Sequence, residues 1–109
     1  MFKENVIENK RKKDFEKKQR TEALLLRNKF LGEWASTILG LNDYKKIKYI
    51  TKVTKFKKEN SKFIIKKIED DFAKNDINIS FKEIELKTKD FHIKANIIVE
   101  NKFKLNNWK

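Results

Sequence analysis

Apolar residues recur at helical spacing along most of the chain, and most densely between Ala23 and Leu41. In that stretch, apolar residues three or four positions apart fall into two adjacent strips, one with Ala23, Leu26, Phe30, Trp34 and Ile38, the other with Leu24, Leu31, Ala35 and Leu39. Such spacing is typical of the broad apolar face of a buried amphipathic helix. Gly40 stands where a left-handed residue can end a helix without a steric penalty from a β-carbon. The pattern predicts a helix over about 21–39, onto which the rest of the chain packs.

A second helix is predicted over about 43–57, capped by Asn42 or Asp43. Its inward strip is expected to contain Tyr44, Ile47, Tyr49 or Ile50, Val53 and Phe56. A third helix, over about 61–74, is expected to begin at Ser61 and to end at Asn75, a residue type that tolerates the left-handed conformation. The core positions of this third helix are Ile64, Ile65, Ile68 and Phe72.

The fourth helix, over about 81–100, has the clearest start signal, because Ser80 and Glu83 have the spacing of a capping box. Ile79 is placed to form a hydrophobic staple with Ile84. The predicted seam consists of Ile84, Thr88, Phe91, Ala95 and Ile98, with Ile93 and Ile97 as candidates to widen it. The tail, residues 101–109, contains Phe103, Leu105 and Trp108, and the pattern leaves open whether it continues the helix or folds back.

The first 20 residues have a different pattern, a polar stretch that could form a helix but has few side chains to bury. Its large apolar residues are Phe2, Val6, Ile7 and Phe15. One interpretation is a frayed, solvated N-terminus. The other is an arm, residues 1–20, that becomes a stable helix when a partner covers those four side chains.

Composition supports a single all-α domain made of an antiparallel four-helix bundle over 21–100, preceded by a mobile, partly helical arm. The chain has no Pro and two Gly, which leaves little turn chemistry for a β-sheet. It has no Cys, which excludes disulfides and zinc–thiolate sites. No apolar run is long enough to cross a membrane, so a cytoplasmic protein without membrane insertion is expected.

The formal net charge of +12 suggests an anionic partner, but three of the 28 basic residues are Arg and the others are Lys. Nucleic-acid readers favour the planar guanidinium of Arg, so nucleic acid is disfavoured and kept as the alternative partner. Lys, Asn, Ile and Phe are enriched together, which resembles the codon bias of an A/T-rich genome. The lysines of the second predicted helix are therefore either a solvated face or an anionic docking surface; the docking candidates are Lys45, Lys48, Lys52 and Lys55.

No set of residues predicts catalysis. His92 is the single His and is expected at the surface or at the boundary of the core. Glu69, Asp70 and Asp71 are adjacent, so on a helix they point in different directions and form no facing acid–base pair. Neither a metal-ligand cluster nor a glycine-rich phosphate loop is present, and no catalytic residue, metal or cofactor is assigned. The sequence favours a binding or regulatory protein over an enzyme.

The segment Arg27-Asn28-Lys29-Phe30-Leu31-Gly32-Glu33-Trp34-Ala35 resembles the signature Arg-Asn-Lys-x-Leu-Gly-x-Trp-Ala of the ATPase inhibitor subunit zeta family of alphaproteobacteria. Further matches follow in order: Leu39-Gly40-Leu41, then Ile64-Ile65-Lys66-Lys67-Ile68 with Asp71-Phe72-Ala73, then Ile77-x-Ile79-Ser80 with Glu83-Ile84. The resemblance covers about residues 22–100. It assigns a structural role to the signature residues Arg27, Asn28, Lys29, Leu31, Gly32 and Trp34.

The resemblance implies a non-catalytic regulator that is monomeric when free and peripherally associated with the inner membrane through its partner. That partner is the catalytic head of the F-type ATP synthase, with its alpha, beta and gamma subunits. The N-terminal segment would enter the head and block rotation in the ATP-hydrolysing direction, and weak binding of adenine nucleotides is also implied. The arm departs from the family, whose segment is mixed in charge and rather acidic, because Lys10-Arg11-Lys12-Lys13 and Lys17-Lys18 make it basic. A family member whose inhibitory role has decayed is therefore a further alternative.

Overall fold

The computed structural model describes residues 2–56 and 60–107, with the side chains of 11–56 and 60–105. All regular structure in these ranges is helical: α1 (Phe2–Ile38), α2 (Asp43–Thr54), α3 (Lys62–Lys74) and α4 (Phe81–Asn107). The predicted all-α, four-helix class is confirmed. The helices differ from the predicted ranges mainly in length, because α1 includes the arm and α4 includes most of the tail.

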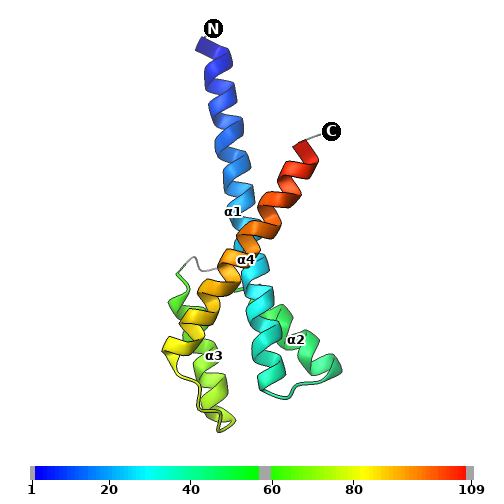
Figure 1. Ribbon diagram of the computed structural model, residues 1–109, viewed down its shortest axis with the longest axis vertical. Helices are drawn as coiled ribbons and strands as arrows, with labels where there is room; N and C mark the ends of the chain where they lie inside the picture. Colours follow the sequence, from blue (N-terminus) through cyan, green and yellow to red (C-terminus); the bar gives the residue numbers. More distant parts are fainter. Residues whose placement is uncertain (1, 57–59, 108–109) are drawn as a thin grey trace.

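Two long helices, α1 and α4, run antiparallel and cross near the middle of the molecule (Figure 1). The short helix α2 packs against α1, and α3 packs against α4, both at the end of the molecule where α1 finishes. Beyond the crossing the first half of α1 and the last half of α4 diverge, so that both chain termini point to the opposite end. The result is elongated, measuring 63 × 26 × 20 Å.

The main core lies among the four helices at the end that contains α2 and α3. Its buried members are Leu31, Ala35, Val53, Ile64, Ile65, Ile68, Phe72 and Ile84. A second, smaller cluster joins α1 to α4 on the open side of the crossing and consists of Ala23, Val99 and Phe103, with Leu26 packed against it.

Glycine ends α1 as predicted. Gly40 has a positive φ of 71°, and the N–H of Leu41 donates to the carbonyl of Ser36 at 3.0 Å. The N–H of Gly40 donates to Thr37, which completes a Schellman motif. The same motif ends α3, but its left-handed residue is Asp76, with φ of 57°. The prediction that Asn75 is left-handed is wrong, because Asn75 has φ of −109° and its side-chain amide donates to the carbonyl of Asp71 instead.

The predicted helix starts are correct at one position of three. Ser80 caps α4, since the N–H of Glu83 donates to Ser80 Oγ at 3.2 Å. Asn42 precedes α2 but makes no side-chain cap bond. Ser61 makes none either, because its backbone is already helical, and Asn60 Oδ1 accepts the N–H of Lys62 in its place.

The faces of α2 and α4 are narrower than predicted. Tyr44 and Ile47 are 73% and 65% exposed, because α2 has one long neighbour, α1, and turns only the strip around Val53 toward it. In α4 the predicted members Ile93, Ile97 and Ile98 are exposed. The strip buried against α1 instead continues at four-residue steps from Ala95 through Val99 to Phe103. The tail thus continues α4, and Trp108 lies outside the described residues.

Gly32 allows α1 and α2 to approach closely. A β-carbon at this position would lie 3.2 Å from Ile50 Cα and 3.3 Å from Val53 Cβ. Because one contact is with backbone, a larger side chain at position 32 has to push the two helices apart.

We expect Gly32→Val to lower the free energy of unfolding by about 1–3 kcal/mol, the usual cost of overpacking a core. Urea denaturation followed by circular dichroism measures it. Lys29→Val, at an exposed position three residues earlier on α1, introduces the same β-branched residue without the clash and serves as the control. Equal stability of the two variants would contradict this account of Gly32.

Candidate functional site

The predicted arm forms the first half of α1 and joins the buried half without a break. Between Arg11 and Arg20 the described side chains are exposed, apart from a half-buried Gln19. Of the four proposed anchors, Phe15 is 36% exposed, and the side chains of Phe2, Val6 and Ile7 lie outside the described ones. Mobility of the free arm stays a prediction.

One anchor of the arm has an intramolecular partner. The rings of Phe15 and Phe103 meet edge-to-face, with centroids 4.8 Å apart and planes at 78°. One and a half turns further along α1, Glu22 Oε2 accepts a hydrogen bond from Lys102 Nζ at 3.1 Å. The expectation that the arm has no core to join is therefore wrong at Phe15, because α4 is long enough to reach it.

Arg27 and Asn28, the first residues of the signature, are buried polar residues on α1, with 5% and 3% of their surface exposed. Arg27 donates from Nε and Nη2 to Asn28 Oδ1, at 3.2 and 3.0 Å. Asn28 Nδ2 in turn donates to the carbonyl of Phe56, just after α2, at 3.0 Å. Burial lowers the pKa of the Arg27 guanidinium. This chain of bonds ties α1 to the end of α2.

The other signature residues also pack inward, with one exception. Leu31 is fully buried, and the ring of Trp34 lies edge-to-face against Phe72 of α3 with centroids 5.7 Å apart. Gly32 makes the close approach to α2. Lys29 is exposed. The signature thus lies at the junction of α1 with α2 and α3, where its side chains serve packing.

We expect Asn28→Ala to destabilise the protein by about 1–3 kcal/mol, because the buried guanidinium of Arg27 and the carbonyl of Phe56 both lose their bond to Asn28. Lys29→Ala, at the neighbouring exposed position, should change stability by less than about 0.5 kcal/mol. Urea denaturation compares them. A loss for Asn28→Ala no larger than that for Lys29→Ala would contradict the proposed tie.

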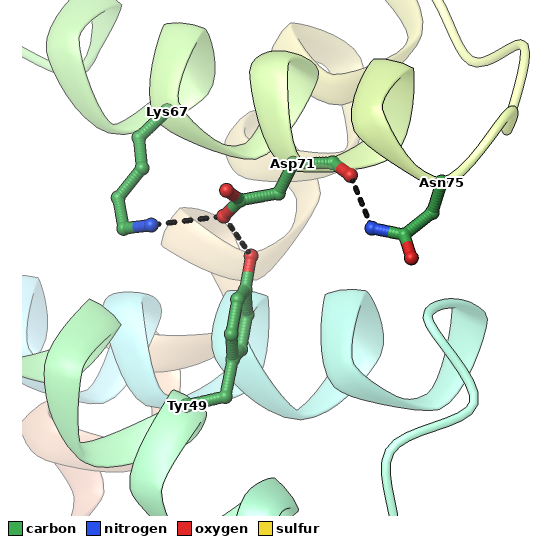
Figure 2. Close-up of polar contacts among 4 residues, drawn as sticks. All are labelled: Tyr49, Lys67, Asp71 and Asn75. Atoms are coloured by element: carbon green, nitrogen blue, oxygen red, sulfur yellow. Dashed lines mark hydrogen bonds and ion pairs between the residues drawn. The ribbon is translucent and has the colours of Figure 1, made fainter.

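A second polar tie joins α2 to α3 (Figure 2). Asp71 Oδ2 accepts hydrogen bonds from the hydroxyl of Tyr49 and from Lys67 Nζ, each at 2.8 Å. Burial, and then the bond to Asp71, raise the pKa of Tyr49 well above its ordinary value. The sequence analysis treated Asp71 only as one of three adjacent carboxylates. The signal available for this pair was the inward position of Tyr49.

The lysines proposed for anionic docking, Lys45, Lys48, Lys52 and Lys55, are exposed. Tyr44 and Ile47 are exposed on the same helix, and Lys48 Nζ lies 5.9 Å from the centre of the Tyr44 ring. Docking through this face stays a prediction.

His92 lies on α4 between two hollows and is half-buried, at the boundary of the core. Its Nδ1 is buried and has no hydrogen-bond partner in the structure. One hollow, of about 510 Å³, is lined by Lys17, Arg20, Thr21, Leu24 and Asn96; the other, of about 410 Å³, by Arg27, Ser61, Glu85, Thr88, Lys89 and Ile93. Burial, and then the charge of Arg27, lower the pKa of His92 below 6.5. Weak binding of adenine nucleotides stays a prediction.

Because the pKa of His92 is lower in the folded chain, the unfolded chain binds the proton more readily below pH 6.5. We therefore expect a contribution to stability that is complete above pH 6.5 and lost as the pH falls below it. His92→Gln should remove this contribution, leaving the loss due to the carboxylates at lower pH. Melting temperatures between pH 7.5 and 5.0 measure it, and identical profiles for the two proteins would contradict the assignment.

Other kinds of site find no support in the part of the chain that the structure describes. No cluster of three or more His, Asp or Glu side chains there could hold a metal ion. None of its helices combines the length and the apolar character needed to cross a membrane.

The comparison with protein families agrees with the geometry of the signature. The family model of ATPase inhibitor subunit zeta matches residues 2–97. The chain belongs to the ATPase inhibitor subunit zeta family. No curated protein and no solved structure matches it. Membership in this family supports a regulatory role in association with an ATP synthase. The match to the zeta family includes the arm and ends within α4, before Val99 and Phe103.

Sequence reasoning missed Phe103 as a residue that contacts the arm. The signal was present, because Ala95, Val99 and Phe103 continue the four-residue spacing of the α4 seam. The choice of Ile98, the larger hydrophobic neighbour, placed the predicted seam one residue off.

Proposed function

We propose that this protein inhibits ATP hydrolysis by the F-type ATP synthase, and that it does so by inserting its arm, residues 1–20, into the catalytic head. Family membership supports the inhibitory role. The observation behind the inserted segment is the form of α1, one helix of 37 residues in which the half that lacks a core carries a row of exposed side chains.

The chain between Phe2 and Leu31 contains no Gly and no Pro, so no helix-breaking residue separates the arm from the buried signature. A partner groove would therefore receive an arm that is already directed by the scaffold. A disordered peptide loses more conformational entropy on binding than such an arm does. Helix-in-groove binding then needs apolar anchors on one face of the arm, and Phe15 is the one with a described side chain.

The scaffold around the main core has a distinct role in this proposal. Four helices with a buried core are too wide to follow a single helix into a groove of helix width, so insertion stops where α2 and α3 begin to pack. The arm would enter the partner while the core remains outside.

Deletion of residues 1–20 tests the arm. We expect the truncated protein to lose inhibition of ATP hydrolysis by the cognate enzyme, because the inserted segment is gone. The remaining helices should keep their circular dichroism signal and melt as before, apart from about 0.5–1.5 kcal/mol for the lost Phe15–Phe103 pair.

The matched control replaces Lys45, Lys48, Lys52 and Lys55 by Ala, which removes the exposed charge of α2 and leaves the arm intact. Retained inhibition by this variant assigns the activity to the arm. If the full-length protein does not inhibit, the function is wrong for this chain. If the truncated protein inhibits and the lysine variant does not, the inhibitory surface is α2.

A further inference from the structure

We propose that the C-terminal clasp, defined as residues 98–107 of α4, holds the arm against the scaffold and competes with the partner for it. This inference rests on the proposed function and adds regulation to the same site. The clasp lies beyond residues 2–97, which the zeta family model matches.

Two contacts connect the clasp to the first half of α1. The ring of Phe103 meets Phe15 at 4.8 Å and is itself only 8% exposed, in a cluster with Ala23 and Val99. The ion pair between Lys102 and Glu22 lies beside this cluster, with its atoms 3.1 Å apart. Both contacts are on the open side of the crossing, where α1 and α4 diverge (Figure 1).

The arm is held loosely elsewhere along this side. A hollow of about 380 Å³ separates it from α4 and is lined by Glu16, Gln19, Arg20, Asn96, Val99 and Glu100. Polar side chains line most of it, so water can fill the space when the helices move apart. Release of the arm therefore requires the loss of one aromatic pair and one exposed ion pair, and leaves the main core intact.

Competition follows from the shared side chain. A groove that takes the face of the arm containing Phe15 must displace Phe103 from it. When a binding-competent state is only a fraction of the population, the apparent dissociation constant rises by the inverse of that fraction. A weaker clasp should therefore give a tighter-binding arm and a stronger inhibitor.

The test compares Phe103→Ala with Leu105→Ala in the full-length protein. Leu105 belongs to the same clasp but is 72% exposed, so its truncation removes a similar side chain without releasing the arm. Amide hydrogen exchange of residues 11–22 measures the clasp without any partner. Inhibition of the cognate ATPase measures competition.

For Phe103→Ala we expect exchange in residues 11–22 to accelerate about two- to tenfold, the range for one aromatic pair, and the concentration for half-inhibition to fall by a similar factor. Leu105→Ala should change neither. Unchanged exchange in Phe103→Ala overturns the clasp, and so does faster exchange combined with weaker inhibition. Faster exchange with no inhibition by any variant, wild type included, supports the clasp and overturns the proposed function.

A charge exchange gives a second test in case Phe103→Ala loosens the whole fold. Glu22→Lys should accelerate exchange in residues 11–22 by up to about fivefold, because it puts two like charges together. Adding Lys102→Glu should restore the original rate by re-forming the pair in the reverse sense. Equal acceleration in the single and the double variant would overturn the clasp.

Discussion

The contact between α1 and α2 around Asn28 and Gly32 is the constraint on which the rest of the structure depends. Gly32 removes the side chain that would keep the helices apart, and the Asn28 carboxamide bonds to the carbonyl of Phe56. With α2 held so close, Val53 enters the core beside Leu31, and Trp34 one turn later meets Phe72 of α3. The strongest family signature therefore coincides with the closest helix contact, where few side-chain volumes fit.

The helical periodicity was sufficient to predict four helices in the right order, but the sides they bury were predicted less well. The prediction assumed a compact bundle in which every helix has two neighbours and a wide apolar face. In the structure α2 and α3 are short satellites of two long helices, so Tyr44 and Ile47 have no neighbour to cover them. Helix starts failed for a local reason, since Ser61 already has helical backbone angles and the neighbouring Asn60 makes the bond.

The candidate site divides in the same way between what a sequence can and cannot encode visibly. The residues that identify the family pack inside one chain, so their spacing records their contacts. The arm is meant for a partner, and the pattern of its residues therefore depends on a surface outside this chain. Phe103 falls between these cases, because it completes a regular strip of α4 yet its contact with Phe15 spans almost the whole sequence.

The unbroken course of α1 also has a mechanical consequence. Twenty residues of helix extend about 30 Å, at about 1.5 Å per residue, from Phe2 to the level of Glu22 and Ala23. An inserted arm of this length is a lever whose fulcrum is the crossing of α1 with α4. A sideways force on its tip becomes a torque at Ala23, Val99 and Phe103, and the resistance of the inhibitor to a turning rotor would depend on how firmly that small cluster is packed.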